Sequence, residues 1–418
     1  MPSRISGTIR ASPSKSVTHR AIVLAALSGG PCTILRPLLS DDTLATVSGV
    51  QALGAKVDPT PDGLRIVGDR LQAPEHPVDA RNSGTTLRLL AGVASLLPGT
   101  TVLTGDESLR SRPMGPLLEA LVNLGANAIS RGGDGRPPVE IRGVLRGGTT
   151  SIEGAISSQF VSSLFIACPL AKESSEIRVR PPVRSEPYLE MTRHIVRMFG
   201  GEIRVDDTLF RVPGGQRYRP RDLEVPGDFS AAAFPLAAAA LTDGDVTVKG
   251  LDPDGPQGDR AVIEILRSFG AHVDVAADRV RARGGDLSAR TVDVGATPDL
   301  FPILAVLATQ ARGESRFVNG AHLRFKESDR IAATVAMLRA LGAHAAATED
   351  GCIVRGPSKL RGGSVNSRGD HRILMAAAVA GLVADDAVDI TDPWCFRVSY
   401  PSFLDDFRSL GALHAVVG

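Results

Sequence analysis

The chain has 418 residues, and Lys+Arg 47 against Asp+Glu 46 leaves a net charge of +1. A single hydrophobic core stops growing at roughly 250–300 residues, so we expect two large domains. The balanced charge gives no support for a nucleic-acid binder. The longest apolar stretches, 231–241 and 373–384, are shorter than the roughly 20 residues that a bilayer span needs, so they predict buried helices and no membrane association.

The cysteines and the N-terminal segment point to the cytoplasm. The segment MPSRISGTIRASPSKS contains no apolar run of the signal-peptide kind. The cysteines are far apart and form no CxxC pair, which predicts reduced thiols. They are Cys32, Cys168, Cys352 and Cys395.

A repeated pattern extends along the whole chain. Segments with a helix-period apolar face, a Gly and a short strand recur at intervals of about 70 residues. In chain order they are 45–59, 117–130, 192–205, 261–275, 333–347 and 403–417. The Gly is expected at the helix C′ position, where φ is positive. These glycines are Gly54, Gly125, Gly200, Gly270, Gly342 and Gly411.

Each repeat also contains a second, more apolar helix followed by a strand-like piece. These helices are predicted at 18–27, 84–97, 157–171, 229–241, 298–309 and 370–384. Because they are apolar on most faces, we expect them inside rings of three repeats. The fold class is therefore α/β, with two similar domains, each made of three repeat units around buried apolar helices. An interaction scaffold is the alternative interpretation of such repeats.

Polar residues at the starts of the apolar helices favour chemistry over a scaffold. A helix N-terminus attracts phosphate and carboxylate without a metal, although a Ser there is most often only an N-cap. The first three helices open with Ser14-Lys15-Ser16 and His19-Arg20, with Asn82 to Thr85 and Arg88, and with Ser157-Ser158-Gln159. Their recurrence at equivalent points predicts an anion site.

Three further stretches carry more charge than a cap needs. They are LRSRPM at 109–114, HLRFKESDR at 322–330 and DHR at 370–372. An isolated charge run is more often a solvated face. His19 and His371 lack the HxxxH or HxH spacing of a zinc site, and neither nucleotide fingerprint is present, so no metal and no cofactor is expected. The GGDG at 132–135 predicts a hairpin turn.

Nine motifs now carry a resemblance: SKSVTHR, NSGTTLR, LRSRPM, SSQF, SEPY, VPGDFSAAA, TPDLF, RFKESDR and GDHR. In this order, from Ser14 to Pro401, they resemble the 5-enolpyruvylshikimate-3-phosphate synthase family of enolpyruvyl transferases. The resemblance implies two domains of three βαβαββ units each. We expect one domain at 14–227 and the other at 1–13 plus 228–418, with the active site in the cleft between them and domain closure on the substrates.

The resemblance implies transfer of the enolpyruvyl group of phosphoenolpyruvate to the 5-hydroxyl of shikimate 3-phosphate, through a tetrahedral intermediate, in the shikimate pathway of aromatic amino acid biosynthesis. A monomeric cytoplasmic enzyme is expected. Asp299 is the implied base toward the hydroxyl, and Glu327 is the implied proton donor to the methylene carbon, with Lys15 close to both. Without the resemblance, the position of Asp299 before an apolar helix would be interpreted as that of a helix N-cap.

The resemblance also implies the substrate contacts. The implied contacts of the shikimate 3-phosphate phosphate are Ser157, Ser158, Ser185 and Lys326. Ser16 and Arg20 are the implied contacts of its carboxylate. The other implied contacts of this substrate are Lys15, Gln159, Tyr188, Asp299 and His322. Those of phosphoenolpyruvate are Lys15, Gly84, Arg112 and Gln159 around its phosphate, and Arg330 and Arg372 at its carboxylate. A planar guanidinium suits a carboxylate better than Lys does.

The chain departs from the family pattern at three points. His322 stands where many members have Asn, and Leu89 where some have Pro. Val398 stands where many have a Lys that contacts phosphate, and the neighbouring Arg397 is a candidate substitute. Gly84 is expected to leave room for phosphonate analogues of phosphoenolpyruvate.

Two competing functions fit the residues less well. UDP-N-acetylglucosamine enolpyruvyl transferases normally carry a Lys-Asn pair and a loop Cys, but here Lys15 precedes Ser16 and 109–114 contains no Cys. A non-catalytic sugar-phosphate binder would keep the arginines but has no need of Asp299 together with Glu327.

Overall fold

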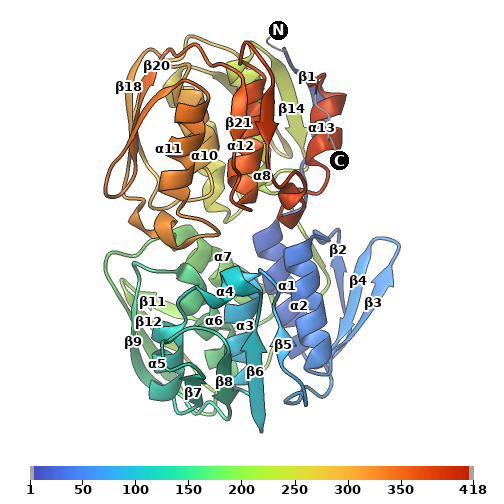
Figure 1. Cartoon of the computed structure of the whole chain (residues 1–418). Coiled ribbons are helices and arrows are strands. Elements are labelled where there is room, and N and C mark those ends of the chain that lie inside the picture. The colour runs from blue at the N-terminus through green and yellow to red at the C-terminus, as the bar shows by residue number, and fades with distance from the viewer. Residues whose placement is uncertain (1–3, 414–418) are drawn as a thin grey trace. The chain divides into compact units, whose positions relative to one another are not determined.

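The structure, a computed structural model, describes residues 4–413 and divides the chain into two compact units (Figure 1). The N-terminal unit is Pro13–Val225. The C-terminal unit contains the chain up to Ser12 together with the residues from Pro226 onward. Each unit has its own hydrophobic core.

Three sheets of one topology form the strands of the N-terminal unit: two parallel strands, then two antiparallel ones. Their orders are β13-β2-β4-β3, β5-β6-β8-β7 and β9-β10-β12-β11. The strands are β2 (Cys32–Leu35), β3 (Lys56–Thr60), β4 (Gly63–Val67), β5 (Val78–Asp79), β6 (Thr100–Thr104), β7 (Asn127–Ser130), β8 (Val139–Arg142), β9 (Gly148–Glu153), β10 (Ser175–Arg180), β11 (Arg204–Asp206), β12 (Leu209–Val212) and β13 (Leu223–Glu224).

The C-terminal unit repeats this topology in two sheets, and its third sheet has the parallel pair alone among the described residues. Its sheets are β1-β14-β16-β15, β17-β18-β20-β19 and the parallel pair β21-β22. The strands are β1 (Ser6–Arg10), β14 (Asp245–Lys249), β15 (His272–Ala276), β16 (Arg279–Arg283), β17 (Thr291–Asp293), β18 (Gly313–Val318), β19 (His344–Ala347), β20 (Cys352–Gly356), β21 (Gly363–Val365) and β22 (Val388–Ile390). β1 enters this unit by pairing in parallel with β14, from Ser6 opposite Asp245 to Arg10 opposite Lys249.

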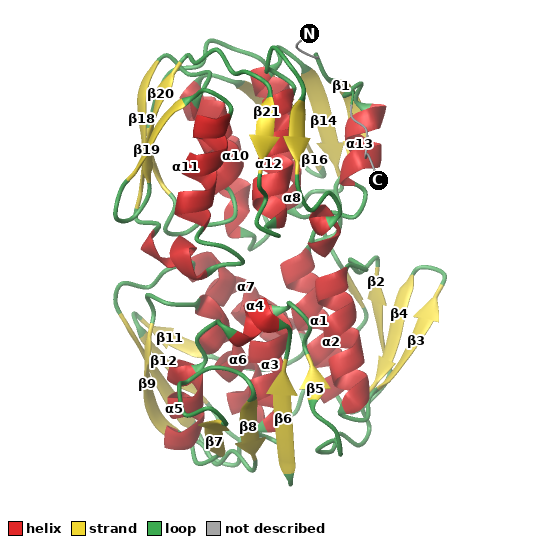
Figure 2. Ribbon diagram, viewed as in Figure 1, coloured by secondary structure: helices red, strands yellow, loops and turns green. Residues whose placement is uncertain are grey.

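Each unit contains buried inner helices and outer helices that have an exposed side (Figure 2). In the N-terminal unit they are α1 (Lys15–Leu27), α2 (Asp41–Ala52), α3 (Gly84–Ala94), α4 (Glu107–Arg110), α5 (Gly115–Asn123), α6 (Ser158–Ala167), η1 (Cys168–Leu170) and α7 (Glu186–Met198). In the C-terminal unit they are α8 (Phe229–Leu241), η2 (Gly258–Ala261), α9 (Val262–Phe269), α10 (Phe301–Ala308), η3 (Ala321–Phe325), α11 (Arg330–Ala340), α12 (His371–Gly381), η4 (Cys395–Val398) and α13 (Phe403–Ser409).

The predicted apolar helices are confirmed as the core helices α1, α3, α6, α8, α10 and α12. In α8, every residue from Phe229 to Ala240 is buried. α3 packs against α6, and α10 packs against both α8 and α12. Small Ala and Gly side chains allow these close helix contacts, which bury apolar surface on all sides of each helix.

The six repeat glycines all have a positive φ, between +84° and +109°, as predicted for the ends of the outer helices. The predicted turn at 132–135 is confirmed, because it joins the antiparallel strands β7 and β8. The strand predicted after Gly411 runs into residues 414–418, which lie outside the described residues. All four cysteines are free, and no helix within residues 4–413 is long and apolar enough to cross a membrane.

Substituting Gly92 tests the packing of α3 on α6. A Cβ there would lie 2.6 Å from Ser163 Oγ and 2.7 Å from the Ser163 carbonyl oxygen. We expect Gly92→Ala to lower the free energy of unfolding by about 1–3 kcal/mol, because the helices must move apart. Urea unfolding followed by circular dichroism measures this change.

Gly381→Ala in α12 is the matched control. The nearest atoms to its new Cβ would be those of Val388, at 3.6 Å, which is ordinary contact. Ala also restricts the unfolded chain, so we expect this variant to gain about 0.5–1 kcal/mol. Equal effects of the two substitutions would contradict the proposed packing constraint.

Candidate active site

Serine residues cap the core helices of the N-terminal unit. Ser14, Ser83 and Ser157 accept hydrogen bonds from the backbone N–H groups of Val17, Thr86 and Gln159, respectively. The N-cap interpretation is therefore correct for all three. It accounts for the serines but not for the charged residues beside them.

Lys15 begins α1 and pairs with a residue that the sequence did not indicate. Its Nζ atom lies 3.0 Å from Asp42 Oδ2, and both side chains are nearly buried. Asp42 lies in the first turn of α2, where an acidic residue is explained by the helix dipole alone. Its contact with Lys15 therefore left no separate signal in the sequence.

Arg20 is a buried cation held by neutral groups. It donates to Thr192 Oγ1 at 2.7 Å, to the Ser16 carbonyl oxygen at 2.9 Å and to Ser162 Oγ at 3.1 Å. Burial lowers its pKa to about 10. Within residues 4–413, Arg20 makes no ion pair with a carboxylate. A buried guanidinium without a counter-ion favours binding of an anion.

Two guanidinium groups converge on Gly84 at the start of α3. A Cβ on Gly84 would lie 2.9 Å from Arg88 Nη1 and 3.3 Å from Arg112 Nη1. Arg112 is also held by Asn82 Oδ1, at 2.7 Å. The sequence indicated Arg112 as a ligand-binding residue but placed Arg88 only at a helix start.

Gln159 connects the starts of α6 and α3. Its Oε1 atom accepts from Arg88 Nη1 at 2.5 Å, and its Nε2 atom donates to Thr85 Oγ1 at 2.9 Å. The amide group thus links two helix starts that are 74 residues apart in sequence. This contact orients the backbone N–H groups of both helices.

Ser185, before α7, has the left-handed φ of 56° that side-chain-bearing residues rarely adopt. Its side chain makes no cap hydrogen bond to the helix, unlike those of Ser14, Ser83 and Ser157. Such local strain is often concentrated at functional sites. Tyr188, one turn later, donates its backbone N–H to the Ser185 carbonyl oxygen at 3.0 Å.

The C-terminal unit gathers its charges around Arg330. This buried guanidinium contacts Asp299 at 2.8 Å, Glu327 at 2.5 Å and Asp370 at 3.0 Å. Burial alone would lower the pKa of Arg330, but Asp370, Glu327 and Asp299 outweigh it and raise the pKa. Both predicted acid–base residues therefore lie on one guanidinium.

Arg372 holds the other oxygen of Asp299. Its Nη2 atom lies 3.2 Å from Asp299 Oδ2, and its Nη1 atom donates to the Ser230 carbonyl oxygen at 3.0 Å. The cap interpretation of Asp299 is wrong, because Leu300 is the N-cap of α10 and has no side-chain cap bond. The carboxylate is instead shared between Arg330 and Arg372.

Asp370 and Asp259 belong to this cluster and were not predicted as site residues. Asp370 caps α12 through the Arg372 N–H, at 2.9 Å, while its carboxylate also pairs with Arg330. Asp259, in η2, accepts a short hydrogen bond from Ser230 Oγ. Burial, followed by the charge of Asp299, raises the pKa of Asp259 to about 7.

The remaining predicted residues lie in helical segments or directly after one. His322 is buried in η3, and Lys326 follows η3 directly. Ser158 is the first residue of α6. Arg397, the candidate substitute for a missing Lys, stacks on Trp394 with 4.2 Å between its Cζ atom and the ring centroid.

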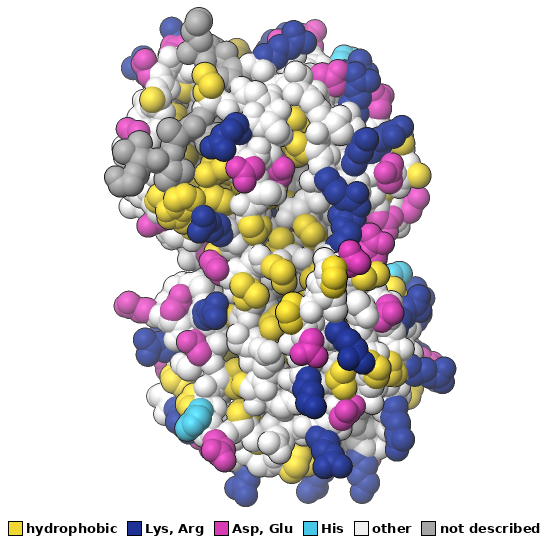
Figure 3. Space-filling model, turned by 90° about the vertical axis from the view of Figure 1, so that its right-hand side faces the viewer, with side chains coloured by type: hydrophobic (Ala, Val, Ile, Leu, Met, Phe, Trp, Pro, Cys, Tyr) yellow, Lys and Arg dark blue, Asp and Glu magenta, His cyan; other side chains and the backbone are white. Residues whose placement is uncertain are grey.

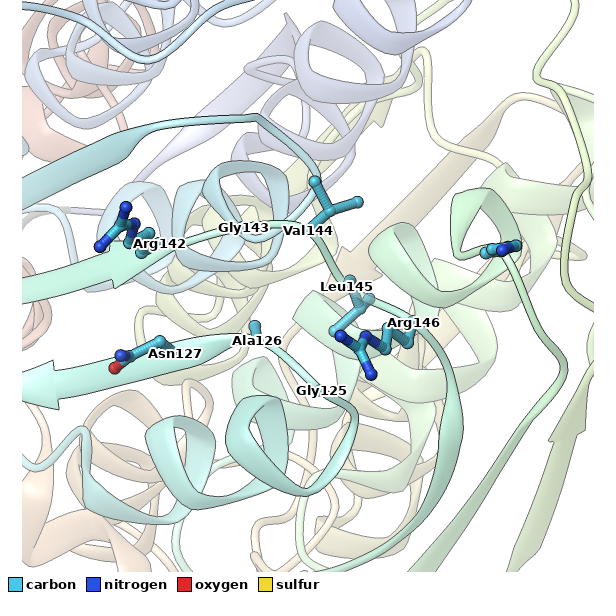
Figure 4. Close-up of a pocket in the computed structure, with 9 residues that line it drawn as sticks. Gly125, Ala126, Asn127, Arg142, Gly143, Val144, Leu145 and Arg146 are labelled. Atoms are coloured by element: carbon cyan, nitrogen blue, oxygen red, sulfur yellow. The ribbon is translucent and has the colours of Figure 1, made fainter.

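A surface pocket and the surface charges elsewhere in the described residues do not form a second candidate site. A surface pocket of about 410 Å³ beside Arg142, Arg146 and Lys172 (Figure 4) contains none of the predicted site residues. On the face in Figure 3, positive and negative side chains are interspersed. No group of three or more His, Cys, Asp or Glu within residues 4–413 could hold a metal ion.

Two α/β units of repeated topology, with buried guanidinium and carboxylate groups in or beside the first turns of their helices, are typical of an enzyme that acts on small anionic metabolites. A family model for EPSP synthase (3-phosphoshikimate 1-carboxyvinyltransferase) matches residues 1–407. The chain belongs to this family.

Similar proteins extend over almost the whole chain. Proteins named 3-phosphoshikimate 1-carboxyvinyltransferase from Methanocorpusculum labreanum and Methanothrix thermoacetophila are 50% and 49% identical to it, each over 98% of this chain and 97% of the relative. A solved EPSP synthase structure from Acinetobacter baumannii matches with a TM-score of 0.82 at 29% identity, covering 98% of this chain and 97% of that chain. The predicted fold class is confirmed.

The pKa of Asp259 predicts a pH-dependent stability. An unfolded Asp loses its proton near pH 3.8, whereas folded Asp259 keeps it until about pH 7. The unfolded state therefore binds fewer protons in this range, so Asp259 makes the wild type less stable as pH rises from about 4 to about 7. Asp259→Asn lacks this titration, and we expect its stability relative to the wild type to increase over that range.

Urea midpoints of both proteins at about pH 4.5, 6 and 8 measure this difference. Asp405→Asn, on the exposed end of α13, controls for removal of a carboxylate. A difference between Asp259→Asn and wild type that stays constant with pH would contradict the raised pKa.

Proposed function

We propose that this protein transfers the enolpyruvyl group of phosphoenolpyruvate to the 5-hydroxyl of shikimate 3-phosphate, giving 5-enolpyruvylshikimate 3-phosphate and phosphate. Family membership supports this reaction. The observation that carries it is the cluster in which Arg330 contacts both Asp299 and Glu327. A carboxylate-binding group beside two acid–base groups is what this addition and elimination requires.

Phosphoenolpyruvate is proposed to bind through both of its anionic groups. Arg330 and Arg372 receive its carboxylate, for which planar guanidinium groups are suited. Its phosphate is received at the starts of α1, α3 and α6. The phosphate contacts are Lys15, Gly84, Arg112 and Gln159, and the position of Arg88 beside Gly84 adds it to this set.

Shikimate 3-phosphate is proposed to bind mainly at helix starts of the N-terminal unit. Arg20 and Ser16 receive its ring carboxylate, and the absence of an ion pair on Arg20 among the described residues supports this role. Ser185, whose hydroxyl does not cap α7, receives the phosphate together with two serines of α6 and a lysine. The full phosphate set is Ser157, Ser158, Ser185 and Lys326, and Lys15, Gln159, Tyr188, Asp299 and His322 complete the contacts.

The proposed reaction has an addition and an elimination. Asp299 accepts the proton of the 5-hydroxyl as its oxygen bonds to C2 of phosphoenolpyruvate, while Glu327 donates a proton to C3. In the elimination, ionised Glu327 takes a proton back from C3 as the C–O bond to phosphate breaks, which restores the double bond. The leaving phosphate takes the proton held by Asp299, so both carboxyl groups return to their starting forms. Lys15 stabilises the negative charge on the phosphate.

The ion pairs around Arg330 suggest how substrate prepares the proton donor. Glu327 is paired with Arg330 at 2.5 Å, which favours its ionised form. A substrate carboxylate on Arg330 competes for this guanidinium and adds a like charge beside Glu327. Both changes favour protonation of Glu327, the form that it needs as a donor.

The free cysteines support a location in the reducing cytoplasm as part of this proposal.

Phosphate release from phosphoenolpyruvate tests the function directly. We expect release with shikimate 3-phosphate as the acceptor and none with UDP-N-acetylglucosamine. The product is checked by mass spectrometry for the added enolpyruvyl group. Release with the nucleotide sugar alone would overturn the proposed acceptor, and release with neither acceptor would overturn the reaction.

Alanine variants separate chemistry from binding. We expect Asp299→Ala and Glu327→Ala to lower kcat by about 10²–10⁴-fold with smaller changes in KM, because each removes an acid–base group. Arg372→Ala mainly raises KM for phosphoenolpyruvate. Steady-state kinetics with both substrates varied gives these values.

Asp405→Ala and Arg408→Ala are the matched controls, because this pair is exposed on α13. We expect wild-type kinetics from both. Equal losses in kcat and in substrate affinity for Asp299→Ala and Glu327→Ala would contradict the roles given to them.

A further inference from the structure

A buried chain of hydrogen bonds joins α1, α2 and α3 in the N-terminal unit. His19 Nδ1 lies 2.6 Å from Thr46 Oγ1, which lies 2.6 Å from Thr86 Oγ1. Thr86 Oγ1 in turn lies 2.8 Å from Ser83 Oγ. These four side chains are no more than 1% exposed. Four buried polar groups in one row are costly unless each is satisfied.

The chain of hydrogen bonds ends at two parts of the proposed site. Ser83 caps α3, which begins at Gly84. Thr86 Oγ1 also lies 3.3 Å from the carbonyl oxygen of Asp42, whose carboxylate holds Lys15 at 3.0 Å. Gly84 and Lys15 are both proposed contacts of the phosphoenolpyruvate phosphate. None of His19, Thr46 and Thr86 is among the proposed substrate contacts.

Each hydroxyl has one proton to donate, which gives the chain a direction. A carbonyl oxygen only accepts, so Thr86 directs its one proton to this side, where the proton is shared between Ser83 Oγ at 2.8 Å and the Asp42 carbonyl oxygen at 3.3 Å. Thr86 then accepts from Thr46, and Thr46 accepts from His19. His19 must therefore carry its proton on Nδ1.

The opposite direction satisfies fewer groups. Thr86 would donate to Thr46, and its contact with the Asp42 carbonyl oxygen would have no proton. His19 would then carry its proton on Nε2, a buried atom that has no hydrogen-bond partner among the described residues. A buried N–H without an acceptor bears the full desolvation cost.

His19 performs this role as a neutral group. Burial, then the charges of Lys15 and Arg20, hold the pKa of His19 well below its usual value of 6.5. A neutral imidazole with Nδ1–H donates one hydrogen bond and adds no charge beside Lys15. Helix packing alone would not require this tautomer, since an apolar side chain could fill the same space.

We propose that His19 is a positioning residue, which donates from Nδ1–H into the Thr46–Thr86–Ser83 chain and so fixes Lys15 and the first turn of α3 for phosphoenolpyruvate. The inference rests on the proposed function for its ligand. Hydrogen-bond partners that orient metal ligands change affinity or activity by about 10–100-fold when removed, and we expect an effect toward the lower end of this range for residues that orient a phosphate site. A shift of the α3 start would move the N–H of Gly84 away from the phosphate.

Two pairs of variants test the chain of hydrogen bonds from His19 to Ser83. Thr46→Val keeps the shape and removes the hydroxyl, and Thr46→Ser keeps the hydroxyl. His19→Leu removes the donor, and His19→Asn keeps a donor near the Nδ1 position. We expect Thr46→Val and His19→Leu to raise KM for phosphoenolpyruvate about tenfold, with less than about a twofold change in KM for shikimate 3-phosphate. Thr46→Ser and His19→Asn should stay closer to the wild type.

Circular dichroism and urea midpoints establish that each variant is folded at the assay temperature. A lower urea midpoint with unchanged KM in both Thr46→Val and His19→Leu would overturn the proposal, because His19 would then serve stability alone. If His19→Leu fails to fold, the Thr46 pair decides the kinetic test.

The tautomer is measured on the wild-type protein without any assay. Long-range ¹H–¹⁵N correlation of ¹⁵N-labelled histidine identifies Nδ1–H against Nε2–H, and the His19→Asn spectrum assigns His19 among the 8 histidines. We expect Nδ1–H, unchanged between about pH 5.5 and 8.5. An Nε2–H tautomer or a protonated ring would overturn the inference. The expected tautomer in a wild type without enolpyruvyl transfer would instead count against the proposed function.

Discussion

Burial of the core helices is the constraint on which the rest of the structure depends. Each of these helices is enclosed along nearly its whole length, as in α8, so a charged group in the middle would lose its hydration without a partner. The charged residues of these helices therefore lie within the first two turns, as Arg20 does in α1 and Arg88 in α3. The N-terminal ends also offer unpaired N–H groups and a positive dipole, which suits phosphate and carboxylate ligands.

Buried charge is handled in two different ways in the two units. Arg330 is surrounded by three carboxylates, so its charge is compensated before any ligand arrives. Arg20 is surrounded by hydroxyl and carbonyl oxygens instead. Under the proposed function, a ligand carboxylate displaces existing partners at Arg330, whereas at Arg20 it supplies the first carboxylate partner among the described residues. The proposed roles of the two arginines differ accordingly: binding at Arg330 changes the surroundings of Asp299 and Glu327, and binding at Arg20 does not.

The N-terminal site depends on residues that do not themselves contact the proposed ligands. Asp42 holds Lys15, and the row from His19 to Ser83 supports the start of α3. Such support positions the N–H groups that are proposed to bind phosphate. In the C-terminal unit, Asp370 supports Arg330 and Arg372 in a similar way, because it contacts Arg330 and caps the helix α12 that carries Arg372.

The sequence by itself determined the repeats, the core helices and the family, because each depends on local order along the chain. A continuous apolar stretch predicted α8 from its first residue to its last, and the C′ glycines required only a positive φ. Tertiary structure alone decided which charges are paired. The roles of Asp42, Asp259 and Asp370 depend on partners at least 27 residues away, and no local pattern encodes such contacts. Asp299 shows the same limit, since its position resembles a cap until folding brings Arg330 and Arg372 to its two oxygens.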